Sequence, residues 1–434
     1  MIKEYLGTGS KIRKEVLKSG LTVYFLPFSG RNNFYIDYVA KYGSLINTFK
    51  FENEKRFKTE PYGIAHFLEH KLFEQEDGVD PFEFFSKYGI DSNASTGYKA
   101  TSYYIEGTKC SKEGLDFLIK FVNNPYFTDK NVEKEKGIII EELNMYRDDP
   151  FDTLLRNSLE CVFKNNEARI DIGGSSSSVK KITKEELYRC YEAFYNPRNM
   201  VLFIGGNYDY NELMEVLNDN EKIITKDKIF DVEVKREIEP YDINVKYKEI
   251  TINGLAISKM LYTIKENLTG MNKEDRFIYD FVVNFILDIV YSETSLFYKE
   301  GINNKLFNNF EFDTSIIDDF MLIQFATESN NAKEIIPIIK KYYDEITISD
   351  EDLERYKKVN ISKIVRKFDY VTPAMNEIKD DLIDFGDILY NKIELIKSID
   401  IKKVKRIKKD IDFENVSIVI GKPKAKKRIV NNKE

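Results

Sequence analysis

The sequence predicts an α+β protein of two homologous domains, each a mainly antiparallel sheet packed with helices. Three observations predict this fold class. The chain has 434 residues, which exceeds one ordinary hydrophobic core. Strand-like apolar runs alternate along it with segments of helical period. The order of elements in residues 1–220 returns in residues 243–434, which indicates a degenerate duplication.

The first half, residues 1–220, is expected to hold the following elements. Two strands surround a Ser-Gly turn in KEVLKSGLTVYFLPF, and NNFYIDYVAKYGS and NMVLFIGGN are further strands. Two adjacent strands are expected at 91–98 and 101–107. Helical patterns lie near 62–76, 80–88, 111–122, 129–147, 150–164 and 183–195, and a short helix starts at Tyr210.

Residues 221–242 lack a clear period and carry mixed charge, so we expect them to link the two domains. Residues 243–434 then repeat the pattern. Strands are expected near 243–265 and 308–327 and in VSIVIGK, with helices near 273–291, 332–346 and 350–367 and further helices after them. The Lys-rich tail KPKAKKRIVNNKE has no periodicity and is expected to be a solvated terminus.

Composition excludes several classes of protein. A net charge of −7 and a pI near 5.4 argue against nucleic acid as the main partner. Cys110, Cys161 and Cys190 are odd in number and contain no CxxC, so neither a disulfide framework nor a thiolate zinc site is indicated. The N-terminus has no signal-peptide core, and no uncharged apolar run of about 18 residues is present, so no membrane span is expected. These features favour a cytoplasmic protein.

The two histidines of the chain lie four residues apart in IAHFLEHKLFE, residues 64–74. This segment is expected to be helical, because one apolar stripe runs along it: Ile64, Ala65, Leu68 and Leu72. His66, Glu69 and His70 then share the opposite face. Two imidazoles four apart on a helix can bind one metal ion, and zinc suits them best. The alternative is a pair of surface histidines, but the absence of histidine elsewhere disfavours it.

A carboxylate is expected to complete this site, because a catalytic zinc usually takes three protein ligands. Residues 128–149 form a predicted helix that Thr128 or Asp129 can cap. Its inner stripe contains two glutamates among five residues: Val132, Glu135, Ile139, Glu142 and Tyr146. Glu133 and Glu141 point away from it. A buried carboxylate needs a partner, so Glu142 is the expected ligand and Glu135 its support. Salt bridges of these glutamates to Lys or Arg are the alternative.

The segment HFLEH, residues 66–70, followed by Glu142, resembles the inverted HxxEH…E motif of the pitrilysin/insulinase family of zinc peptidases. Three further segments resemble the family's signatures in order: YGIDSNASTGYKATSYY, VEKEKGIIIEELNMYRDDP and CYEAFYNPRNMVLFIGGNYD. The resemblance covers most of residues 15–210, and the second half matches in architecture alone. The chain is similar to the small bacterial members of the family, which are often encoded in pairs.

This resemblance implies a zinc-dependent endopeptidase whose two domains form one half of a clamshell chamber. His66, His70 and Glu142 would bind Zn²⁺, Glu69 would be the general base, and Glu135 would be a catalytic acid that supports the ligands. An edge strand would pair with an extended peptide substrate. Its residues are Ser92, Asn93, Ala94, Ser95 and Thr96.

The resemblance also shows a departure. Active members orient the substrate with an arginine and a tyrosine in a segment resembling LREKxGLAY. The corresponding stretch here is SLFYKEGINNKLFNN, residues 295–309, where no arginine precedes Lys299 and the tyrosine position falls near Asn304. Tyr298 is out of phase. A paralogous subunit is therefore expected to supply this Arg/Tyr pair in a heterodimer, and a homodimer is the second choice.

Two other functions remain open from the sequence. The chain could be a zinc-retaining peptide-binding or chaperone subunit with little hydrolysis of its own. A structural zinc site is weaker, because such sites usually have four protein ligands.

Overall fold

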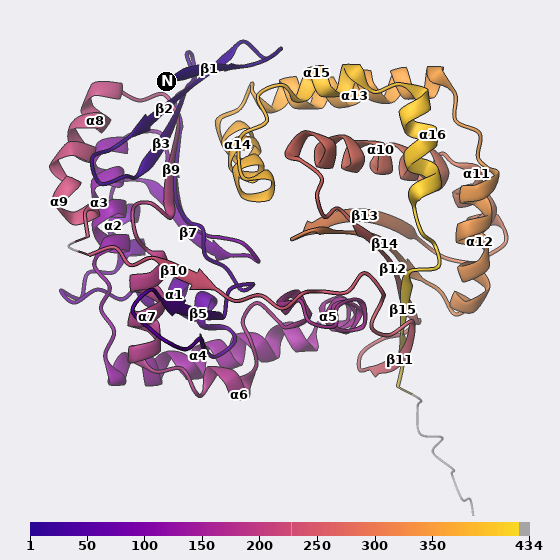
Figure 1. The fold of residues 1–434 in the computed structure, drawn as a ribbon, viewed down its shortest axis with the longest axis horizontal. Coiled ribbons are helices and arrows are strands. Elements are labelled where there is room, and N and C mark those ends of the chain that lie inside the picture. The colour runs from indigo at the N-terminus through magenta and orange to yellow at the C-terminus, as the bar shows by residue number, and fades with distance from the viewer. Residues whose placement is uncertain (227, 425–434) are drawn as a thin grey trace, which may run out of the picture.

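The computed structural model describes residues 1–226 and 228–424, and each half is built on one main sheet (Figure 1). The first sheet has the order β1-β2-β3-β9-β4-β8-β7. Its strands are β1 Ile2–Tyr5, β2 Ser10–Val16, β3 Thr22–Pro27, β4 Phe34–Ala40, β7 Ile90–Thr96, β8 Thr101–Gly107 and β9 Met200–Gly206. A small sheet of β5 Thr48–Phe51, β6 Lys58–Thr59 and β10 Val232–Val234 lies beside it.

The second sheet repeats the part β3-β9-β4-β8-β7 of the first. Its order is β11-β15-β12-β14-β13, with β11 Tyr247–Ile252, β12 Lys259–Asn267, β13 Phe310–Ile317, β14 Phe320–Glu328 and β15 Val416–Pro423. In the first sheet β9 is parallel to β3 and antiparallel to β4. In the second sheet β15 is likewise parallel to β11 and antiparallel to β12. The remaining pairs are antiparallel. Equal order and polarity confirm the predicted fold class of two similar α+β halves.

The helices of the first half are α1 Ile64–Leu72, α2 Pro81–Lys87, α3 Ser111–Asn123, α4 Asp129–Asp148, α5 Pro150–Val162, α6 Ser176–Val179, α7 Lys184–Phe194, α8 Tyr210–Asp219 and α9 Glu221–Ile224. Those of the second half are α10 Lys273–Tyr291, α11 Leu296–Asn303, α12 Ala332–Glu345, α13 Asp350–Lys367, α14 Val371–Phe385, α15 Lys392–Ser398 and α16 Ile401–Asp410. Most agree with the helical periods of the sequence to within two residues. The predicted helix at 62–76 is shorter, because it starts after Gly63 and ends at Leu72.

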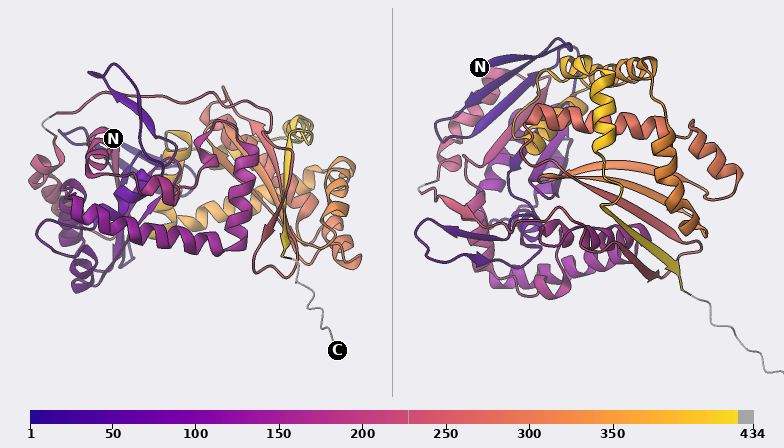
Figure 2. Two further views of the ribbon diagram at one scale, coloured as in Figure 1. Left: turned by 90° about the horizontal axis from the view of Figure 1, so that it is seen from below. Right: turned by 45° about the vertical axis from the view of Figure 1, so that its right-hand side comes forward.

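The two halves exchange helices: one helix of each half packs on the sheet of the other half. Helix α5 of the first half packs on β11, β12 and β15, and α14 of the second half packs on β4 and β9 (Figures 1 and 2). Each sheet therefore has helices on both faces: α3 and α14 lie on opposite sides of the first sheet, and α10 and α5 on opposite sides of the second (Figure 1). This double covering explains why β4 and β9 are buried along their whole length and carry few charges.

Close packing against a glycine marks the exchange of α14. A Cβ at Gly205 in β9 would lie 2.3 Å from the sulfur of Met375 in α14, so a larger residue there would displace the Met375 side chain. In β15, a Cβ on Gly421 would lie 2.5 Å from Ile252 of the neighbouring β11 and at an ordinary contact distance, 3.6 Å, from Leu154 of α5. A buried ion pair between Asp37 of β4 and Lys379 of α14, with 2.9 Å between the charged atoms, adds a polar contact to the first exchange.

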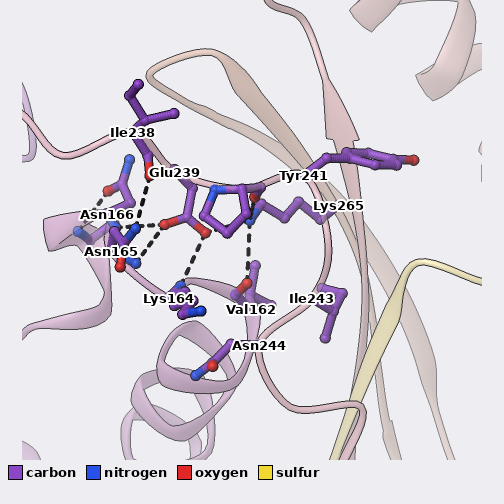
Figure 3. A network of polar contacts seen from close by, with 12 residues as sticks. Val162, Lys164, Asn165, Asn166, Ile238, Glu239, Tyr241, Ile243, Asn244 and Lys265 are labelled. Carbon is purple, nitrogen blue, oxygen red and sulfur yellow. Dashed lines mark hydrogen bonds and ion pairs between the residues drawn. The ribbon is translucent and has the colours of Figure 1, made fainter.

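The described part of the predicted linker, residues 221–226 and 228–242, makes specific contacts with both halves. It contains α9 and β10, and β10 pairs with β5. Glu239 accepts hydrogen bonds from the backbone N–H groups of Lys164, Asn165 and Asn166 (Figure 3). The Lys265 ammonium lies 2.6 Å from the same carboxylate.

Four further expectations from the sequence concern the N-terminal strand, the cysteines, the C-terminal tail and membrane-spanning segments. The N-terminal strand β1 was missed, because IKEY is short and mostly polar. The three cysteines are free. The tail beyond Lys424, predicted to be solvated, lies outside the described residues. In the part of the chain that the structure describes, one helical stretch, Lys273–Asn303, is long and apolar enough to cross a membrane. This is weak evidence for a span, because ten side chains of α10 are buried in the protein core.

Candidate metal centre

Helix α1 positions both histidines directly after a tight turn. Gly63 at its N-terminus has φ +90°, and a Cβ there would lie 2.2 Å from the carbonyl oxygen of Gly173. Only glycine meets both conditions. The predicted apolar stripe is buried in the core: Ile64, Ala65, Leu68 and Leu72. His66 and His70 are half-buried on the other side, with their ring centroids 4.6 Å apart.

Helix α4 brings the predicted carboxylates to the histidines. Thr128 caps it by accepting a hydrogen bond from the backbone N–H of Asn131, as one of the two predicted caps. Glu135 is buried and Glu142 half-buried on the face toward α1, while Glu133 and Glu141 are exposed as expected. Tyr146, the last residue of the predicted inner stripe, is not buried as predicted. It is 48% exposed, because the last turn of α4 extends beyond the core.

His66, His70 and Glu142 form a donor set that fits zinc. One donor atom of each lies within 4.8 Å of the others. Nε2 of His66 is 3.8 Å from one carboxylate oxygen of Glu142, and Nε2 of His70 is 3.4 Å from the other. Ligands about 2.0–2.2 Å from a tetrahedral zinc ion lie about 3.3–3.6 Å apart. Within residues 1–226 and 228–424, no second group of three such side chains meets the same distance criterion.

The protonation state of His66 also suits a metal ligand. Burial lowers its pKa to about 4, and His70 adds to the effect. His66 is therefore neutral at pH 7 and has a free lone pair. Its Nδ1 is buried without a hydrogen-bond partner among the described residues, next to Gly173 of the turn that holds α1.

Glu69 lies beside the donor set without belonging to it. Its carboxylate accepts a hydrogen bond of 2.5 Å from Oγ1 of Thr96 in β7. Burial raises the pKa of Glu69, although this hydrogen bond and the charge of His70 oppose the shift. A buried carboxylate with a raised pKa next to a metal site can accept and return a proton near neutral pH.

Glu135 orients His70 from the side away from Glu142. One of its oxygens is 3.1 Å from Nδ1 of His70. Burial by itself would lower the pKa of His70, but the hydrogen bond to Glu135 and the surrounding carboxylates raise it. The pKa of Glu135 is lowered despite burial, because of His70 and the nearby Lys71. A carboxylate on Nδ1 leaves Nε2 as the metal-facing nitrogen.

Lys71 is a component of this centre that the sequence analysis missed. Its side chain is completely buried, although it follows His70 directly on α1. Its ammonium is 3.7 Å from the second oxygen of Glu135 and also pairs with Glu74. A lysine between apolar helix positions carries no local signal of burial.

Strand β7 forms the edge of the first sheet beside the metal centre. The five residues predicted for substrate pairing, Ser92 to Thr96, lie on it, and they are half-buried and exposed in alternation. Two cavities flank the centre. One of about 660 Å³ is lined by Glu69, His70, Phe73, Asn93 and Ala94 among others. Another of about 280 Å³ is lined by His66, Thr96, Tyr98, Glu142 and Arg156 among others.

The segment 295–309 lies far from the metal centre of its own chain. It contains α11, which is at the opposite end of the molecule from α1 and α4 (Figure 1). Tyr298 is half-buried against Phe307, with 5.7 Å between the ring centroids. No residue of this segment lines either cavity beside the metal centre.

Comparison with known proteins gives consistent matches. Residues 57–174 match the model of the insulinase family (peptidase family M16), and residues 181–360 match the peptidase M16 inactive domain. The chain is 33% identical over 98% of its length, and 100% of the other, to a Bacillus subtilis protein named an uncharacterized zinc protease, YmfH. An uncharacterized zinc protease of Rickettsia felis is 30% identical over 46% of this chain and 47% of that protein.

Solved structures agree in fold. An M16-like peptidase from Alicyclobacillus acidocaldarius superposes with a TM-score of 0.89 at 26% identity, covering 97% of this chain and 100% of the other. Pitrilysin superposes with a TM-score of 0.73 at 16% identity, covering 98% of this chain and 46% of pitrilysin. At that identity the likeness to pitrilysin concerns the fold alone.

Proposed function

The chain belongs to the insulinase family, peptidase family M16, and we propose that it is an endopeptidase that hydrolyses peptides or small unfolded proteins. Its cofactor is zinc. The observation that carries the proposal is the arrangement of a three-residue zinc site, a buried glutamate outside the ligand set, and the edge of a sheet next to both.

Each residue has a role that its environment supports. His66, His70 and Glu142 would hold zinc, which when bound supplies Lewis-acid activation of a water molecule and of the scissile carbonyl. Glu69 takes a proton from the attacking water and delivers it to the leaving amine. Thr96 fixes one Glu69 oxygen by its hydrogen bond and leaves the other for the proton. Glu135 holds the ring of His70.

The substrate would bind as an added strand. An extended peptide on the free edge of β7 obtains main-chain hydrogen bonds that do not depend on its sequence. Its side chains beside the scissile bond would enter the two flanking cavities, one next to Asn93 and Ala94 and one next to Thr96. Because this mode requires extended backbone, it favours unfolded chains over folded proteins.

A second subunit would complete the site. The positions of an arginine and a tyrosine that orient substrate are not filled in residues 295–309, and α11 lies far from the metal centre of its own chain. A paralogous subunit facing this chain could present these groups, which makes a heterodimer the proposed unit. Positioned donors of this kind contribute about 10²–10³ in rate, so the isolated chain should be slow. We also propose a cytoplasmic location, on the sequence features given above.

A zinc-retaining peptide-binding subunit is the second candidate. The missing arginine and tyrosine and the match of residues 181–360 to the inactive domain favour it. The two functions are separated by measuring zinc content and cleavage of a mixture of unstructured peptides by mass spectrometry, with and without a co-expressed paralogue. Cleavage that Glu69→Gln abolishes supports the endopeptidase. Stoichiometric zinc without cleavage in either sample would establish the peptide-binding subunit instead.

A further inference from the structure

Lys71 is a charged side chain buried within the metal centre, and none of the roles described so far uses it. The exposed fraction of its side chain is 0%, compared with 24% for the neighbouring His70. An unpaired ammonium in such a place would strongly destabilise the fold, so the partners of Lys71 determine what it does.

The partners of Lys71 are two carboxylates in the wall of the larger cavity. Its ammonium contacts Glu74, three residues later on the chain, and lies 3.7 Å from Oε2 of Glu135. The other oxygen of Glu135, Oε1, is 3.1 Å from Nδ1 of His70. One carboxylate therefore joins a buried cation on one side to a predicted metal ligand on the other. Glu69, Glu74, Asp80 and Glu135 line the cavity together with Lys134, whereas Lys71 lies behind them.

We propose that Lys71 is a positioning residue that holds Glu135 in the orientation in which it accepts the Nδ1 proton of His70. The inference rests on the proposed zinc site of His66, His70 and Glu142. Lys71 contacts neither substrate nor metal in this role. It acts through Glu135, and the consequence is that His70 keeps one tautomer and directs Nε2 at the metal.

The effect of removing Lys71 on zinc affinity distinguishes a positioning role from a purely electrostatic one. A positive charge near a zinc ion disfavours zinc binding by repulsion, so removing Lys71 would strengthen binding if charge alone mattered. Removing a group that orients a ligand weakens binding, typically by 10- to 100-fold for partners of this kind. The two roles therefore predict changes of opposite sign.

Lys134 supplies the matched control. It directly precedes Glu135 in α4, lines the same cavity and is exposed. Among the described residues it forms no ion pair. Lys71→Met and Lys134→Met remove the same charge near Glu135. In only one of them does Glu135 lose a cation that contacts it.

The test measures zinc affinity by competition with a chromogenic chelator, and the histidine tautomers by ¹H–¹⁵N NMR of the zinc-free chain labelled in histidine. Two histidines in the whole chain make the spectrum simple. Lys71→Met should weaken zinc binding about tenfold and give His70 a second tautomer, while Lys134→Met stays within about twofold of wild type. If Lys71→Met does not fold, the neutral Lys71→Gln replaces it with the same expectation.

Unchanged or tighter zinc binding in the Lys71 variant, or an equal loss in Lys134→Met, would overturn the inference. A lower melting temperature with unchanged tautomers would also overturn it, because that is the result of a purely structural role. A wild-type chain that binds zinc but cleaves no peptide would refute the proposed endopeptidase only, since these measurements do not depend on turnover.

Discussion

The contact between Glu239 and Lys265 should be one of the most sensitive points of the fold, although it lies in the segment between the two halves. The exposed fractions of the two side chains are 4% and 0%. Lys265 also donates to the carbonyls of Val162 and Pro240 (Figure 3). Its ammonium lies over the rings of Phe163 and Phe320, at 5.0 and 4.6 Å from their centroids. Burial lowers the pKa of Lys265 although Glu239 opposes the shift, so the ammonium depends on its partner.

The perturbation is Glu239→Gln, which keeps the shape and removes the charge. Its amide NH₂ would meet donors, because the carboxylate accepts from the N–H groups of Lys164, Asn165 and Asn166 as well as from Lys265. Removing one partner of a buried ion pair costs about 3–5 kcal/mol. At about 2–4 °C per kcal/mol for domains of 150–250 residues, the melting temperature should fall by roughly 6–20 °C.

Calorimetry measures this fall, and hydrogen exchange locates it. The amides of residues 164–166 should exchange faster in Glu239→Gln than in wild type. Glu237→Gln is the matched control, because Glu237 is an exposed glutamate in the same segment. If the free energy of unfolding of Glu239→Gln changed by less than about 1 kcal/mol, and the three amides stayed protected, the reasoning would be refuted. The ion pair would then not stabilise the contact between the two halves.

Three further predictions concern the metal centre and the pH dependence. His70→Ala should lose stoichiometric zinc by metal analysis and melt at a lower temperature, because the metal joins α1 to α4; retained zinc would contradict the ligand assignment. Glu69→Gln should keep zinc but lose about 10²–10⁴-fold in peptide hydrolysis, and loss of the metal would make Glu69 a ligand instead. Burial raises the pKa of Glu266 to about 7 from 4.5. Stability from this group is therefore complete below about pH 4.5 and is lost as the pH rises to 7, by roughly 3 kcal/mol at most. Glu266→Gln should remove this part of the pH dependence and melt above wild type at pH 8; parallel melting curves at pH 5 and 8 would show that Glu266 does not titrate in this way.

The sequence by itself determined what depends on neighbours along the chain. Helices α1 and α4 follow from apolar period, and His66 and His70 reach one point because they are four apart on a helix. Glu142 could be predicted too, because it is a carboxylate in a stripe that should be buried and such a group requires a partner. The repeated order of strands and helices predicted two similar halves.

Tertiary structure decided which side chains from distant segments meet. Lys71 and Glu239 are charged residues without a local signal, and their burial depends on Glu135 and on Lys265 in other elements. The exchange of α5 and α14 between the halves likewise could not be predicted, because an apolar helix face does not specify which sheet it covers. Local periodicity fixes the face that a helix buries, whereas the partner of that face, and any charge buried with it, is fixed only when the whole chain packs.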